Sequence, residues 1–351
     1  MDNSSEIESL DLNPKLTAAL LKAKLLTCKN ILALSEPELQ HKTRLSHQEI
    51  TTILTSVARL VLKNLSSSTA LQIKQGECPN VFKLKKLSTG CGILNSFLRG
   101  GILLRHITEI SGESASGKTQ FCLQLSIQMR LPIELGGLNG GVVYICTEDV
   151  FPIKRLHQMI EIMVQKLYKC YDLNYFMDNI YITQIGDLPN LWKCLEKQLP
   201  PLIMSRNIKL VILDSVAALF RCEYGIDQTM ERSLDLQKLG LILRRLATAH
   251  GLAVICVNQV TDIIDETVNE SNNCTIPALG LTWSNLIHTR IMLARTNITY
   301  KIETDSRNHF TEQKVRNMKV IFSPHLPSST CHFVVITEGV KDLFEVLYKF
   351  A

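Results

Sequence analysis

The segment Gly112-Glu-Ser-Ala-Ser-Gly117-Lys118-Thr119 constrains the fold of this chain more than any other feature. It has a glycine, four residues and then Gly-Lys-Thr, the pattern of a loop that wraps around phosphate groups. Its glycines let the main chain approach a phosphate and direct N–H groups at it. Lys118 would bring positive charge to the outer phosphates, and Thr119 would offer a hydroxyl to Mg²⁺. The predicted nucleotide-binding residues are Gly112, Glu113, Ser114, Ala115, Ser116, Gly117, Lys118 and Thr119.

The sequence on both sides supports this interpretation. Residues 106–111 are typical of a strand, and residues 119–131 place apolar side chains on one helical face before Pro132 stops the helix. A strand, a glycine-rich turn and a helix in this order predict a phosphate-binding loop within an α/β fold.

Composition indicates a globular protein. The chain has 351 residues, of which 46% are apolar and 20% charged, and its net charge is +5. No run of eighteen apolar residues occurs, and the first residues lack the pattern of a signal peptide, so we expect no membrane partner. The eleven cysteines are scattered, and several lie in apolar runs. This favours a reducing compartment over a disulfide framework or a zinc site.

Three regions are predicted along the chain. Residues 1–63 form a helical N-terminal lobe, with helix-start signals at Ser35–Glu38 and Ser46–Glu49. Residues 64–82 form a polar linker, and residues 83–351 form the core. The lobe is basic at Lys15, Lys22, Lys24 and Lys29, which fits either a solvated surface or a face that touches DNA.

Strands and helices alternate in the core. Short apolar runs suit strands that are covered on both faces, which predicts a mostly parallel sheet with crossover helices. After Trp283 the pattern changes to an antiparallel extension, with an exposed hairpin or arm at residues 296–317. The expected parallel strands are residues 107–111, 142–147, 180–185, 210–214 and 253–258. The later strands are residues 287–293, 318–322 and 333–337.

Three polar side chains follow predicted strands at the edge where such sheets bind ligands. Asp214 ends an apolar strand and would hold Mg²⁺ through a water. Glu148 follows another strand and would accept a proton from attacking water. Gln259 would sense the γ-phosphate, since an amide both donates and accepts. With Lys118, Glu148 and Gln259 form the predicted catalytic set, and Thr119 with Asp214 the predicted metal site.

These motifs, in this order, resemble those of the RecA-type recombinase ATPases, above all the eukaryotic strand-exchange recombinases and their paralogues. The segments Leu87–Asn95 and Ile276–Trp283, together with the helical lobe, extend the resemblance over nearly the whole chain. It implies a RecA-like ATPase core, with ATP and Mg²⁺ as cofactors. It also implies that Arg155 lies near the adenine. Two DNA-facing loops are implied as well, and the first, at about residues 221–233, contains Arg221 and Arg232.

The resemblance further implies a role in the repair of DNA breaks by homologous recombination. The expected partners are a second recombinase paralogue in a heterodimer, single-stranded or branched DNA, and the main strand-exchange recombinase. The expected activity is weak DNA-dependent ATP hydrolysis, and the expected location is the nucleus, with some protein in the cytoplasm. Two alternatives stay open: a non-hydrolysing scaffold with structural ATP, and a hexameric DNA-unwinding motor.

Departures from the family pattern modify these expectations. Asp149 stands where the recombinases have glycine, which adds negative charge near the phosphates. Ser67 replaces the aromatic anchor of their linker, and Phe322 the aspartate that caps ATP across a subunit interface. The second candidate DNA loop, residues 260–280, has four carboxylates and no lysine or arginine. Because phosphate binding depends on cations, we expect the chain alone to bind DNA poorly.

Overall fold

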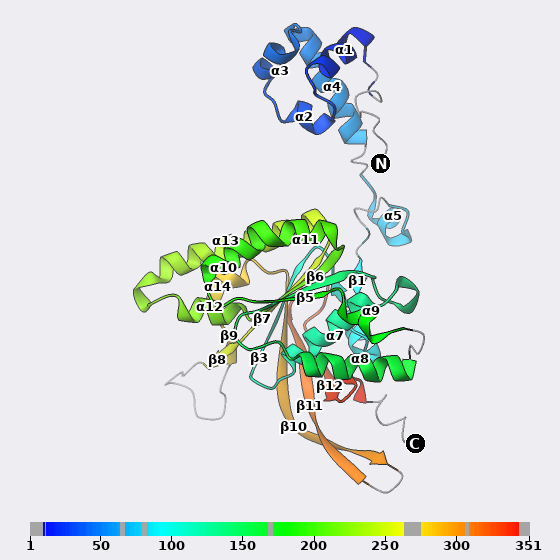
Figure 1. Cartoon of the computed structure of the whole chain (residues 1–351), viewed down its shortest axis with the longest axis vertical. Helices are drawn as coiled ribbons and strands as arrows, with labels where there is room; N and C mark the ends of the chain where they lie inside the picture. The colour runs from blue at the N-terminus through cyan, green and yellow to red at the C-terminus, as the bar shows by residue number, and fades with distance from the viewer. Residues whose placement is uncertain are drawn as a thin grey trace. The chain divides into compact units, whose positions relative to one another are not determined.

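The computed structural model describes residues 10, 12–63, 67–78, 83, 85–167, 171–262, 275–305 and 309–343 (Figure 1). The chain divides into two compact units, Met1–Lys83 and Leu84–Ala351. Among the helices in these ranges, none is long and apolar enough to cross a membrane.

The first unit is entirely helical in its described part. Leu20, Ile31, Leu39, Ile50 and Ile53 are fully buried and form its centre, because each helix places its apolar residues on one face. The predicted helical lobe is therefore confirmed. Its helices are α1 (Pro14–Lys22), α2 (Cys28–Leu32), α3 (Glu36–Thr43) and α4 (His47–Lys63).

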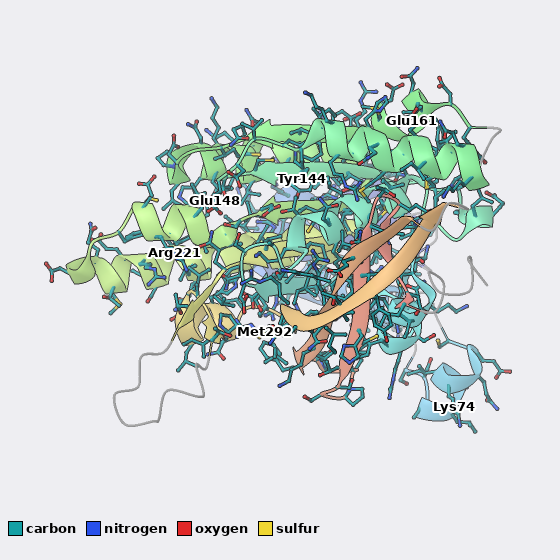
Figure 2. The ribbon with its side chains drawn as sticks, turned by 90° about the horizontal axis from the view of Figure 1, so that it is seen from below. Lys74, Tyr144, Glu148, Glu161, Arg221 and Met292 are labelled. Atoms are coloured by element: carbon teal, nitrogen blue, oxygen red, sulfur yellow. The ribbon has the colours of Figure 1, made fainter. Side chains whose placement is uncertain are left out.

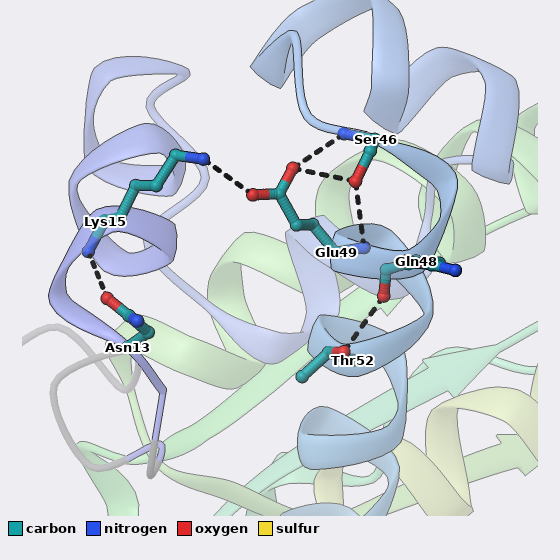
Figure 3. A network of polar contacts seen from close by, with 6 residues as sticks. All are labelled: Asn13, Lys15, Ser46, Gln48, Glu49 and Thr52. Carbon is teal, nitrogen blue, oxygen red and sulfur yellow. Dashed lines mark hydrogen bonds and ion pairs between the residues drawn. The ribbon is translucent and has the colours of Figure 1, made fainter.

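Both predicted helix starts in the lobe are capping boxes. Ser35 caps α3 together with Glu38. At the start of α4, Glu49 accepts hydrogen bonds from the backbone N–H and the hydroxyl of Ser46, at 2.8 and 2.9 Å (Figure 3). Lys15 of α1 donates to the other oxygen of Glu49 at 2.8 Å. These contacts lower the pKa of Glu49 to about 2, and the hydrogen bond from Lys15 contributes most.

The range expected to be a linker contains a short helix, α5 (Ala70–Gln75). Thr69 and Gln72 form a capping box at its start, and Gly76 ends it with φ +77°. Thr69 and Ala70 lie just after Ser67, in the segment Ser67–Ala70 that corresponds to the aromatic linker anchor of the recombinases. They begin a helix here, because Thr69 is a good N-terminal cap.

The second unit is built on a nine-stranded sheet (Figure 1). Strands β10, β3, β7, β6, β4 and β5 are parallel, while β11, β12 and β13 extend the sheet antiparallel. The two smaller sheets pair β1 with β2 and β8 with β9. In spatial order the large sheet is β13 (Gly339–Lys341), β12 (Thr330–Ile336), β11 (His309–Phe322), β10 (Thr289–Asp305), β3 (Ile107–Gly112), β7 (Ala253–Asn258), β6 (Ile208–Asp214), β4 (Gly141–Cys146) and β5 (Ile180–Gln184). The small strands are β1 (Lys86–Leu87), β2 (Ile102–Leu103), β8 (Val260–Asp262) and β9 (Thr275–Pro277).

Helices cover both faces of the sheet, as expected for buried parallel strands. One face packs against α6 (Gly92–Phe97), α7 (Lys118–Arg130), α8 (Ile153–Leu167) and α9 (Leu173–Met177). The other packs against α10 (Leu188–Lys193), α11 (Leu199–Ser205), α12 (Val216–Cys222), α13 (Thr229–His250) and α14 (Gly280–Ser284). Cys122 and Cys256 are fully buried between these layers, and burial raises the pKa of both thiols well above its ordinary value.

The α/β fold predicted from the sequence is thus confirmed, including the antiparallel extension. The expected hairpin at residues 296–317 is formed by the outer parts of β10 and β11, which pair as far as Asp305 and His309. The topology brings the carboxyl ends of β3, β7, β6 and β4 to one edge of the sheet, where the predicted site residues follow.

Candidate nucleotide site

The predicted phosphate loop joins β3 to α7. Gly112 ends the strand with φ +155°, and a Cβ there would lie 2.2 Å from the carbonyl oxygen of Leu293. Gly117 precedes the helix with φ +104°. Any larger residue at Gly112 would therefore displace the adjacent strand β10, which explains why glycine is required. The loop leaves the Ser116 hydroxyl buried without a hydrogen-bond partner among the described residues.

Lys118 lies across the mouth of this loop. Its ammonium group donates to the carbonyl oxygens of Gly112 and Glu113, both at 2.7 Å. Burial lowers the pKa of Lys118, although the negative charges of Asp214 and Glu148 act in the opposite direction. A half-buried cation whose present partners are backbone carbonyls is suited to binding an anionic group in the loop.

Asp214 and Thr119 meet as the predicted metal site requires. The Thr119 hydroxyl lies 3.1 Å from Oδ2 of Asp214, at the end of β6. The Tyr144 hydroxyl of β4 donates to the same oxygen at 2.6 Å, a contact that our sequence analysis missed. Burial raises the pKa of Asp214, and the hydrogen bonds from Tyr144 and Thr119 oppose this rise. A buried carboxylate beside a hydroxyl can form part of an oxygen site for Mg²⁺.

Glu148 and Gln259 are connected directly. The Gln259 amide donates to both oxygens of Glu148 at 2.8 Å, and the Ser215 hydroxyl lies 3.2 Å from one of them. On its other side, Gln259 accepts a hydrogen bond from the guanidinium of Arg221 on α12. Figure 2 labels Glu148, Tyr144 and Arg221 in this region. Glu148, Gln259 and Arg221 thus form a relay from the cavity to α12.

One cavity of about 530 Å³, a size that suits a nucleotide, is lined by side chains of the loop and of the strand ends. They include Lys118, Thr119, Glu148, Asp214 and Gln259. Arg316 of β11 also lines it, and its Nε lies 3.4 Å from the carbonyl oxygen of Ala115. Its cross-strand neighbour Arg295 binds Glu113 of the loop through two hydrogen bonds of 2.7 and 3.0 Å. Sequence reasoning missed both arginines, because only the register of β10 and β11 places them beside the loop.

Arg155, expected near an adenine, lies between α7 and the end of β12. It donates to Gln120 at 2.8 Å and to the carbonyl oxygens of Ile336 and Thr337. Gln120 lines the cavity. Arg155 is therefore one side chain away from the cavity wall.

The candidate DNA loops differ from expectation. Residues 221–233 are mostly helical rather than a long loop, so Arg221 lies on α12 and Arg232 on α13. Between these helices, the Gln228 side chain accepts a hydrogen bond from the N–H of Gly225 at 2.9 Å. In the second loop, β8 and β9 pair. Residues 263–274, where most of its carboxylates occur, lie outside the described residues.

A buried cluster of polar side chains lies next to the site. Glu109 of β3 is fully buried and accepts hydrogen bonds from Asn258 at 2.6 Å and from the indole of Trp283 at 2.9 Å. It also forms an ion pair with Arg290, whose guanidinium packs over the ring of Phe322. Because Asn258 directly precedes Gln259, this cluster fixes the backbone next to the middle residue of the relay.

Comparison with known proteins agrees with the fold. Residues 81–343 match the Rad51 family model, and residues 7–61 match an XRCC3/RpoA-like helix-hairpin-helix domain. The chain is 36% identical to mouse DNA repair protein XRCC3, over 96% of this chain and 98% of the mouse protein. It is 38% identical to the bovine protein of the same name, over 96% and 98%. It is 30% identical to DNA repair protein rhp57 of Schizosaccharomyces pombe, over 97% and 99%. The chain therefore belongs to the Rad51 family.

Proposed function

We propose that this chain is an ATP-binding recombinase paralogue that acts in the repair of DNA breaks by homologous recombination. The observation that carries the proposal is that Lys118 and the Thr119–Asp214 pair line one cavity at the end of the phosphate loop. The three relatives named above are DNA repair proteins, which supports the repair role. That role implies a nuclear location.

Each side chain has a distinct task in the proposal. Lys118 exchanges its carbonyl partners for phosphate oxygens, and Arg316 adds a second positive charge from β11. Thr119 and Asp214 would hold a magnesium ion, which would neutralise charge on the phosphates. Arg155 fixes Gln120 at the cavity wall. Glu148 orients the attacking water and Gln259 responds to the outer phosphate.

Slow hydrolysis follows from the relay. Both oxygens of Glu148 accept the Gln259 amide, and Ser215 contacts one of them, so Glu148 must change partners before it can orient a water. The same observation favours a second candidate function, a scaffold that keeps ATP as a structural ligand. Both versions place the chain in a heteromeric complex with a second recombinase paralogue, and that complex binds DNA and supports filaments of the main recombinase.

Two variants separate these functions. Glu148→Gln removes the base but keeps the size of the side chain, while Lys118→Ala removes the phosphate contact. Glu161→Gln, a change at a half-buried residue of α8, is the matched control. Repair of DNA breaks is measured in cells that express each variant as their only copy, and ATP turnover in the purified complex. Loss of repair in both test variants supports the hydrolysing paralogue, whereas loss in Lys118→Ala alone supports the scaffold. Repair unaffected by Lys118→Ala would contradict both.

A further inference from the structure

A band of positive charge lies at the amino ends of the central strands, at the opposite sheet edge from the nucleotide cavity. The six residues of β3 separate the two edges by roughly 17–20 Å. Several turns meet at this edge. The N–H of Arg105 donates to the carbonyl oxygen of Leu252, and that of His288 to Ile107. His106 and His288 pack edge to face with ring centroids 4.7 Å apart.

The cations of this band come from five separate segments that touch one another. The Lys86 ammonium group donates a hydrogen bond to the carbonyl oxygen of Arg99. The Arg99 guanidinium in turn donates to the carbonyl oxygen of His325. Arg105 lies beside Gly251, and Lys209 donates to the carbonyl oxygen of His250 at 3.3 Å. We call this surface the basic edge. Its cationic members are Lys85, Lys86, Arg99, Arg105, Lys209 and Arg244.

No carboxylate compensates these charges in the described structure. Residues 85–87, 99–107, 208–210, 244–252, 286–289 and 322–326 contain no aspartate or glutamate. None of the six cations takes part in an ion pair among the described residues. Burial and then the charge of Arg99 lower the pKa of Lys86. The pKa of His288 is lowered to about 4, mainly by burial and then by the charges of His106 and Arg244. The surface is therefore one of uncompensated positive charge.

We propose that the basic edge binds the phosphodiester backbone of a nucleic acid, as a contact separate from the candidate DNA loops. The proposal rests on the proposed function for its choice of DNA. An acidic protein partner is disfavoured because protein interfaces are anchored by exposed apolar or aromatic side chains. None of the large exposed apolar residues lies in the segments that build this edge. A phosphate backbone needs only accessible cations, and Lys85, Arg99, Arg105 and Arg244 are exposed.

The test uses the full-length chain and a fluorescent DNA duplex of about 30 base pairs, titrated at several salt concentrations with and without ATP and Mg²⁺. Arg105→Gln/Arg244→Gln removes two exposed charges whose guanidinium groups make no hydrogen bond within the described residues. Lys193→Gln/Lys197→Gln removes the same charge from another exposed surface. Each lost phosphate contact should flatten the plot of log affinity against log salt by about 0.9. The edge variant should therefore lose about 1.8 in slope and bind roughly 60-fold more weakly at 0.1 M salt.

We expect the edge variant to lose slope and affinity, and the control variant to keep both. The same result is expected with and without ATP and Mg²⁺. Equal binding by the edge and control variants would overturn the inference and leave the proposed function intact, because repair in cells is measured separately. The inference also fails if the wild-type chain does not bind duplex at low salt. Labelled polyglutamate serves as a second probe. If it binds the wild-type chain but not the edge variant, while duplex DNA binds neither, the basic edge would be assigned to an acidic protein instead.

Discussion

Glu109→Gln should destabilise the second unit strongly. In the wild-type chain, the Glu109 carboxylate neutralises Arg290, which is only 7% exposed, and accepts hydrogen bonds from Asn258 and Trp283. Glutamine can still accept the bonds from Asn258 and Trp283, but its amide donors face the guanidinium. One Arg290 nitrogen, Nη2, already has no hydrogen-bond partner within the described structure. The variant would thus leave a buried, uncompensated cation.

The magnitude follows from the loss of one partner of a buried ion pair, which costs about 3–5 kcal/mol. For a domain of this size, each kcal/mol lowers Tm by about 2–4 °C, so a decrease of roughly 6–20 °C is expected. Calorimetry or circular dichroism on the full chain measures it. Adding Arg290→Met should recover part of the loss, because the double variant no longer buries a charge.

Glu161→Gln is the control for this prediction. The Glu161 side chain on α8 is 46% exposed, and its polar partners among the described residues are Gln165 and His157. Its loss should therefore change stability by less than about 0.5 kcal/mol. The reasoning would be refuted if Glu109→Gln lowered Tm no more than Glu161→Gln does. If the two single variants' losses in Tm simply add in the double variant, Glu109 and Arg290 do not stabilise each other.

Three further predictions concern single side chains. Asp214→Asn should stabilise the nucleotide-free chain, since burial raises the pKa of Asp214 and disfavours its charge. The gain, measured by urea unfolding, should vanish below the ordinary aspartate pKa, grow as pH rises from there to the raised pKa, and stay constant above it. Arg316→Gln should weaken ATP binding about 10- to 100-fold in a fluorescence titration, and unchanged affinity would remove Arg316 from the site. Gly101→Ala should cost about 2–4 kcal/mol in unfolding free energy, because its Cβ would lie 2.0 Å from the carbonyl oxygen of Leu87, whereas Gly136→Ala, which meets nothing within 4 Å, should cost about 1–2 kcal/mol.

The parts of the fold that depend on local pattern were predictable from the sequence. The strand before the phosphate loop and the helix after it follow from short-range periodicity and from Pro132. The capping boxes at Ser35 and Ser46 likewise mark helix starts through contacts three residues apart. The parallel order of the strands then brings Asp214 to the edge where the loop lies.

The rest depends on contacts between distant residues. Arg316 reaches the loop only because β11 pairs with β10, and no short-range pattern shows that register. Tyr144 looks like an ordinary strand residue until β4 and β6 are adjacent and its hydroxyl meets Asp214. Residues 221–233 were expected to form a loop because of the resemblance to the recombinases, yet residues 226–233 are helical.

Calorimetric titration of the folded, full-length chain with ATP and Mg²⁺ tests the central claim most directly. We expect measurable heat of ATP binding for the wild-type chain, alone or in its complex, and no such heat for Lys118→Ala. The Lys193→Gln/Lys197→Gln variant should bind as the wild type does, because both lysines lie outside the cavity. No heat from the well-folded wild-type chain in either state, or equal heat from Lys118→Ala, would contradict it.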